Sequence, residues 1–97
     1  MTIIKHKVGD TVTIEVTVDN LSEDYISPEL KLYGKKSRDG FKDIIKTVEP
    51  QDIVDNKFIF VYNTDDFIKY PKTYYGHFNI DNDGIILNNF YKIKATY

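Results

Sequence analysis

The stretch from Thr11 to Asp19, T-V-T-I-E-V-T-V-D, decides the fold class of this chain. Apolar residues occupy every second position from Val12 to Val18, and polar residues occupy the positions between them. Successive side chains of a β-strand point to opposite faces, so this period of two predicts a strand with one buried and one solvated face. Most of these residues are β-branched, which also favours a strand.

The same alternation recurs in shorter runs on both sides of this stretch. Turn signals at Gly9-Asp10, Ser37–Gly40 and Asp81–Gly84 separate neighbouring runs, and polar loops are expected at Asn20–Pro28 and Pro50–Asn56. The further strands predicted are Ile3–Lys7, Leu30–Lys36, Phe41–Val48, Lys57–Tyr62, Thr73–Asp81, Ile85–Asn88 and Tyr91–Tyr97.

Two segments depart from simple alternation. Lys57–Tyr62 is apolar at nearly every position, which indicates a central strand buried on both faces. Thr64–Ile68 is expected to form a single helical turn, with Thr64 as its cap. No other segment has a helical period. The pattern therefore predicts an all-β protein, a single antiparallel β-sandwich domain over residues 1–97 with about seven or eight short strands.

Composition excludes several classes of protein. The 97 residues contain no cysteine, so disulfides and thiol redox chemistry are absent. The formal net charge of −2 gives no overall attraction to nucleic acid or to an anionic membrane, and neither is expected as a partner. The N-terminal residues lack the apolar run of a secretory signal, which favours folding in the cytoplasm.

The residue types that carry chemistry are not arranged as in known sites. Asp81–Gly84 resembles the start of a calcium loop, but Lys92 stands where the twelfth-position glutamate would be, so a hairpin turn is expected. Only two histidines, His6 and His77, could ligate zinc, and His77 is expected to be a solvated strand residue. We therefore expect no enzyme activity, no metal and no cofactor.

A cluster of tyrosines is the candidate for a contact surface. Tyr70, Tyr74 and Tyr75 lie close together around Pro71, and tyrosine-rich patches are common in protein interfaces and sugar-binding surfaces. The alternative is that strand alternation places half of them in the core. A second cluster is basic and comprises Lys35, Lys36, Arg38 and Lys42, for which a solvated hairpin tip is expected.

The order of these elements resembles a family of small immunoglobulin-like domains found in structural proteins of tailed bacteriophages. The resemblance rests on Gly9–Val16, the apolar strand Phe58–Tyr62, the turn residues Thr64–Asp66, the stretch Tyr75–Phe78 with Asp81–Gly84, and the final strand Tyr91–Tyr97. It implies an immunoglobulin-like sandwich and a non-enzymatic part of the virion, made in the host cytoplasm.

Within that resemblance, the leading hypothesis is an auxiliary capsid (decoration) protein that binds other virion proteins. The alternatives are a tail or baseplate adaptor and a carbohydrate- or surface-binding module. Self-association as a homo-oligomer is also left open.

Overall fold

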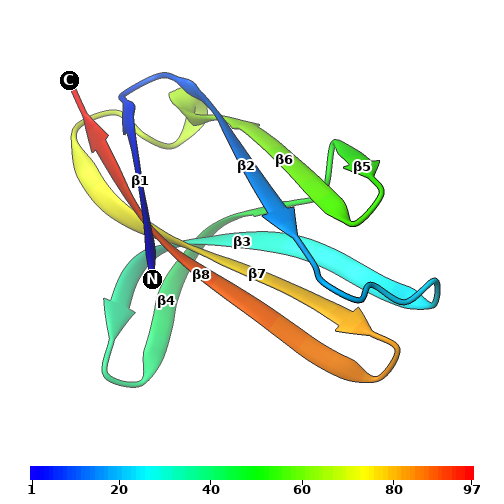
Figure 1. Cartoon of the computed structure of the whole chain (residues 1–97). Coiled ribbons are helices and arrows are strands. Elements are labelled where there is room, and N and C mark those ends of the chain that lie inside the picture. The colour runs from blue at the N-terminus through cyan, green and yellow to red at the C-terminus, as the bar shows by residue number, and fades with distance from the viewer.

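A computed structural model describes all residues from Met1 to Tyr97 and contains eight β-strands in two sheets. The larger sheet has five strands in the order β1-β8-β7-β3-β4, and the smaller has three in the order β2-β6-β5 (Figure 1). The strands are β1 (Thr2–Lys7), β2 (Thr11–Thr17), β3 (Tyr25–Ser37), β4 (Gly40–Val48), β5 (Asp52–Val54), β6 (Lys57–Asn63), β7 (Lys72–Asn82) and β8 (Ile85–Thr96).

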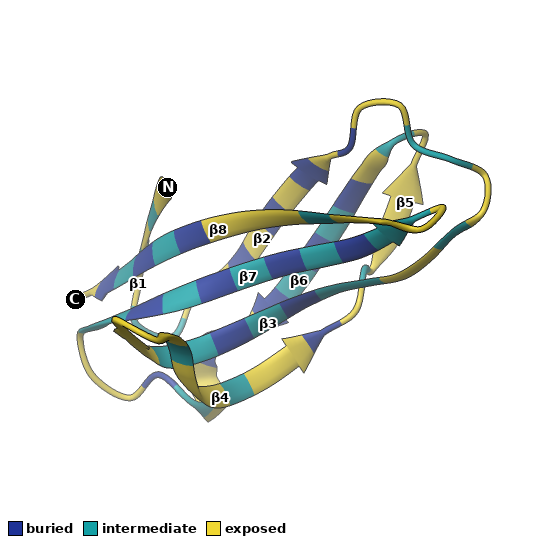
Figure 2. Ribbon diagram, turned by 90° about the horizontal axis from the view of Figure 1, so that it is seen from below, coloured by how far each residue is buried: buried dark blue, intermediate teal, exposed yellow.

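The core lies between the two sheets, and alternation along each strand fills it. In β2, every second residue from Val12 to Val18 is buried, as the sequence predicts. The facing layer comes from β3, β7 and β8, where Leu32, Phe78 and Ile93 are at most 1% exposed. Figure 2 shows the resulting stripes of buried and exposed residues along these strands. The all-β prediction is confirmed.

The prediction of purely antiparallel pairing is wrong at β1, which pairs parallel with β8 from Thr2↔Tyr91 to Lys7↔Thr96. The chain then crosses to the other sheet through the turn at Gly9, whose φ of +90° is readily adopted only by glycine. Thr64, the first residue after β6, donates both its backbone N–H (3.1 Å) and its hydroxyl (2.7 Å) to the carbonyl of Asp10. These bonds tie the connection between β1 and β2, which lie in different sheets, to the end of β6.

An irregularity in β4 explains why Ile44-Ile45 breaks the alternation. The β3–β4 register shifts between Leu32 and Tyr33, which leaves one extra residue on β4, and Asp43 has a φ of +61°. Such a bulge bends a hairpin and increases its twist. In Figure 1 the β3–β4 hairpin bends away from the three-stranded sheet.

Other differences from the sequence predictions are local. The expected loop at 50–56 contains the short strand β5, and the last two predicted strands form one continuous strand, β8. β6 is central in its sheet, but Ile59 and Val61 are only half-buried, so β6 is not buried on both faces. The helical turn is a 3₁₀ turn over Thr64–Asp66, capped by the Asn63 side chain rather than by Thr64, which is buried.

Candidate binding face

The outer face of the five-stranded sheet, the side turned away from β2, β6 and β5, is the candidate site (Figure 2). Cross-strand partners place their side chains on the same face of a sheet, so the register defines rows across it. From the β7–β8 turn toward the opposite end, the rows are Ile26–Asp81–Ile86, Glu29–Asn79–Asn88, Lys31–His77–Phe90, Tyr33–Tyr75–Lys92–Ile3 and Thr73–Lys94–Lys5.

An aromatic cluster occupies the centre of this face. The imidazole of His77 stacks on the ring of Phe90, with centroids 4.7 Å apart and an angle of 10° between the planes. Phe41, from the bent β3–β4 hairpin, contacts Phe90 at 5.4 Å, Tyr33 at 5.5 Å, Tyr75 at 5.7 Å and His77 at 6.2 Å between ring centroids. Contacts of this kind stabilise by about 0.5–1.5 kcal/mol each beyond burial. The β3–β4 hairpin thus contributes Phe41 to a cluster whose other members lie on β3, β7 and β8.

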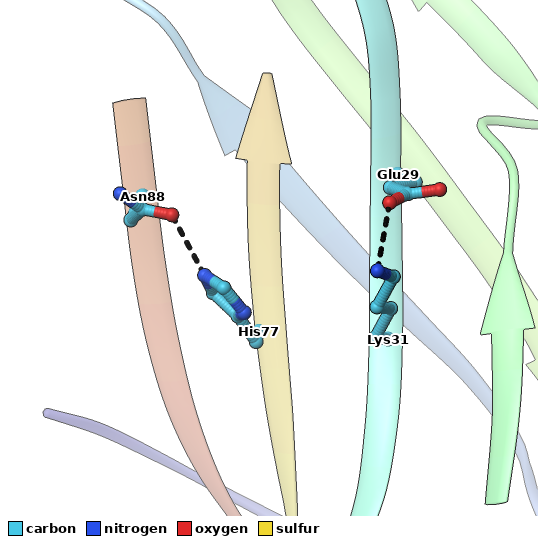
Figure 3. Close-up of polar contacts among 4 residues, drawn as sticks. All are labelled: Glu29, Lys31, His77 and Asn88. Atoms are coloured by element: carbon cyan, nitrogen blue, oxygen red, sulfur yellow. Dashed lines mark hydrogen bonds and ion pairs between the residues drawn. The ribbon is translucent and has the colours of Figure 1, made fainter. Parts of the chain in front are cut away.

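Two polar contacts flank the cluster (Figure 3). The His77 Nε2 atom lies 2.7 Å from the Asn88 Oδ1 atom, an arrangement in which the ring donates. Lys31 pairs with Glu29, with Nζ and Oε1 3.3 Å apart. His77 lies on the outer face, out of phase with the buried Phe78 as predicted, and its ring is half-buried by stacking on Phe90.

Large apolar side chains remain exposed on the same face. Ile3, Ile26 and Ile86 are 54%, 58% and 57% exposed, and Phe90 is 40% exposed. Phe90 belongs to the aromatic cluster, Ile3 lies in the next row toward β1, and Ile26 and Ile86 lie two rows away, near the β7–β8 turn. A monomeric surface rarely gathers large apolar side chains on one face, and such patches mark binding surfaces.

Charge is divided unevenly between this sheet and the rest of the molecule. The strands of the five-stranded sheet carry ten lysines and three carboxylates, a net charge of +7, whereas the remaining residues carry −9. On the outer face itself, Lys5, Lys92 and Lys94 form a positive margin beside the aromatic cluster. A field of this kind favours an acidic partner surface and raises association rates. The positive strands and the negative remainder nearly cancel, so the overall charge of −2 does not show this uneven distribution. The lysines are Lys5, Lys7, Lys31, Lys35, Lys36, Lys42, Lys46, Lys72, Lys92 and Lys94, and the carboxylates are Glu29, Asp43 and Asp81.

The three candidate interface tyrosines lie in three different environments. Tyr75 is half-buried in the outer aromatic cluster. Tyr70 is 62% exposed in the loop before β7, outside the cluster. Tyr74 is fully buried on the inner face, so it belongs to the core. They do not form one patch, because consecutive residues of β7 point to opposite faces.

Tyr74 lies at the centre of a buried chain of hydrogen bonds. Its hydroxyl oxygen is 2.8 Å from the hydroxyl of Tyr62 and 2.8 Å from the Nε2 atom of His6. Burial raises the pKa of Tyr74 to about 12, and burial, followed by the neighbouring Tyr74, raises the pKa of Tyr62 further. This chain satisfies polar groups inside the core and links β1, β6 and β7.

The other motifs have structural positions. Asp81–Gly84 includes the β7–β8 hairpin turn, with Asp83 and Gly84 at φ values of +53° and +87°. The structure has no group of three or more His, Cys, Asp or Glu side chains arranged to hold a metal. Lys35, Lys36, Arg38 and Lys42 lie exposed at the β3–β4 hairpin, as expected. None of the helical segments has the length and apolar character required to span a bilayer.

Comparison with known proteins shows a likeness of fold. No family model matches the chain, and no curated protein matches it. A 1.4 Å crystal structure of an uncharacterized protein from Bacillus anthracis str. Ames matches with a TM-score of 0.55 and 19% sequence identity. The match covers 99% of this chain and 77% of the other, so nearly all of this chain has a counterpart in that fold.

Proposed function

We propose that this chain is a non-enzymatic structural protein of a bacteriophage particle, with an auxiliary capsid protein as the first candidate. In this proposal it is an immunoglobulin-like sandwich whose outer face attaches it to an acidic surface of another virion protein. The observation that carries the proposal is the exposed apolar and aromatic surface on one face of the larger sheet, bordered by lysines. The setting in a phage comes from the resemblance of element order described above.

The chemistry of the face favours a protein partner. Aromatic residues are enriched at the centres of protein interfaces, and polar or charged residues form the rim. Here Phe90 and Tyr75 lie centrally, and Lys92 and Lys94 lie beside them toward β1. Such a surface can bury the apolar side chains and keep the lysines at the solvated edge, where they steer association.

The test is quantitative mass spectrometry of particles purified from cells that encode this chain. We expect the protein in the particles, at a copy number near that of the major shell protein for a capsid accessory and at low copy number for a tail or baseplate adaptor. Phe90→Ser should reduce incorporation, and Thr13→Ser, on the exposed face of β2, is the matched control. Absence from particles despite abundance in the lysate would refute the proposal.

A second candidate function is supported by the aromatic stacking on the outer face. The rings of His77 and Phe90 are stacked and nearly parallel, and Phe90 is 40% exposed, an arrangement suited to stacking against a sugar ring. A carbohydrate-binding module would be retained on a polysaccharide resin or a glycan array, and Phe90→Ser would abolish retention. No retention on any glycan excludes this second function.

A further inference from the structure

The edge of the five-stranded sheet is only half covered. β1 pairs with β8 only from Tyr91 to Thr96, whereas β8 begins at Ile85. The first six residues of β8, Ile85–Phe90, therefore pair with β7 on one side and have no strand on the other. Figure 1 shows this half of β8 extending beyond the N-terminal end of β1.

The register identifies the backbone groups that this leaves unpaired. Asn82 and Ile85 flank the two-residue turn of the β7–β8 hairpin, and such flanking residues exchange both of their hydrogen bonds. Pairing alternates along an antiparallel ladder, so the N–H and C=O groups of Ile86 and Asn88 point away from β7. Farther along the same edge, the carbonyl of Thr96 accepts a bond from the Val8 N–H at 2.7 Å. Thr96 is an even number of residues from Ile86 and Asn88, so its backbone groups point to the same side of β8 as theirs.

A hollow of about 280 Å³ opens beside this edge, between β8 and the end of β2. Its lining is mixed: Val16, Phe78 and Leu87 contribute to the apolar part, and Asp19, Asn88 and Asn89 to the polar part. A second hollow lies between Met1, Thr2 and residues Asn88–Phe90, where the line of β1 would continue. The first volume is at the lower end of the range of small-molecule sites, which suits a single inserted side chain.

We propose that an extended segment of a partner protein adds to the Ile85–Phe90 edge as a sixth strand of this sheet. Its backbone would pair with Ile86 and Asn88, and one aliphatic side chain would enter the hollow above Val16 and Leu87. An extended strand is the occupant because the free groups are a regular row of backbone donors and acceptors, and strand addition to a sheet edge satisfies such a row. The hollow supplies selectivity through one side chain.

This site adjoins the outer face, because Phe90 belongs both to this edge and to the aromatic cluster. The two sites use different groups. A strand in line with β1 binds backbone groups in the plane of the sheet, whereas the aromatic cluster projects from one side of it. The strand-binding proposal therefore does not depend on the proposed function.

The experiment is a selection from a displayed library of random nine-residue peptides, using the purified full chain as bait. We expect enriched peptides to alternate apolar and polar residues. In ¹⁵N-resolved NMR titrations they should slow the exchange of the Ile86 and Asn88 amides. Analytical ultracentrifugation of the bait alone should show a monomer, whereas a dimer paired through this edge would identify a second copy as the occupant and overturn the proposal.

The decisive measurement is an N-methyl scan of the best peptide. Strand addition predicts that N-methylation weakens binding about tenfold or more at every second residue and has little effect at the residues between, because only alternate N–H groups face β8. Asn88→Pro in the protein should weaken binding to a similar extent, with circular dichroism as the check that the fold remains. Because the scan leaves the protein unchanged, it stays informative if Asn88→Pro unfolds. Uniform sensitivity, binding at another edge, or no enriched peptide would each overturn the proposal.

Discussion

The two faces of the five-stranded sheet are built by the same strands but hold their aromatic residues in different ways. On the inner face, Tyr74 and Phe78 are at most 1% exposed and pack against the second sheet. On the outer face, Phe90 is 40% exposed and contacts only His77 of β7 and Phe41 of the bent β3–β4 hairpin among the aromatic rings. The inner cluster maintains the fold, and the outer cluster is free to contact a partner. The role of an aromatic residue in this sheet depends on which face its position in the strand points to, and not on how many aromatic residues are nearby.

The largest expected difference between the faces comes from truncating one phenylalanine on each. Phe78→Ala should lower the free energy of unfolding by about 3–5 kcal/mol, because it removes a buried ring and leaves a cavity. Phe90→Ala should lower it by about 1–3 kcal/mol, the value of its two aromatic contacts, with His77 and with Phe41. Urea unfolding followed by circular dichroism measures both. Similar losses would mean that the outer cluster also belongs to the core.

The hydroxyl groups of adjacent tyrosines provide a finer comparison. Tyr74→Phe should destabilise the protein by about 1–3 kcal/mol, because it leaves the buried hydroxyl of Tyr62 and the ring of His6 without their shared partner. Tyr75→Phe is the matched control on the outer face and should stay within about 0.5 kcal/mol of the original protein. If the two substitutions have equal effects in thermal unfolding, the hydrogen-bond chain adds nothing to stability.

Loss of stability at alkaline pH is expected from a tyrosine of the inner face. Burial raises the pKa of Tyr74 in the folded protein to about 12, above its ordinary value of 10.0, so the folded state holds this proton more tightly. The stability it contributes is complete below pH 10 and is lost as the pH rises from 10 through 12. The loss should reach about 2 kcal/mol from Tyr74. Urea titrations at a series of pH values test this, and a flat profile up to pH 12 would contradict it.

The smallest effect is expected at the ion pair on the outer face. Lys31 and Glu29 are both partly exposed, and pairs of this kind contribute about 0.2–1 kcal/mol. A double-mutant cycle with Lys31→Ala and Glu29→Ala should give a coupling energy of less than about 0.5 kcal/mol, decreasing with added salt. A larger, salt-independent coupling would show that the outer face is more rigid than its exposure indicates.

Most of the inner face was predictable from the sequence. The alternation in Thr11–Asp19 and in Thr73–Asp81 assigns buried residues correctly, and it already places Tyr74 in phase with Phe78 and Ile80. The same alternation places Tyr75 on the opposite face from Tyr74, so the three tyrosines could not form one patch. The outer aromatic cluster was not predictable in this way, because Phe41 contacts residues of β7 and β8, strands with which β4 does not pair. The parallel pairing of β1 also depends on distant contacts that no local pattern reports.

The pairing of β1 with β8 also affects how the chain reaches its fold. The first strand can find its partner only after more than 80 further residues have been made, since Thr2 pairs with Tyr91. Contacts so far apart in sequence slow folding, because the entropy of closing a long loop is lost before the contact forms. During synthesis, Ile3 and Ile4 stay unpaired until the end and are open to pairing with other chains. Lys5 and Lys7, in the same strand, are charges of the kind that protect an edge from such encounters.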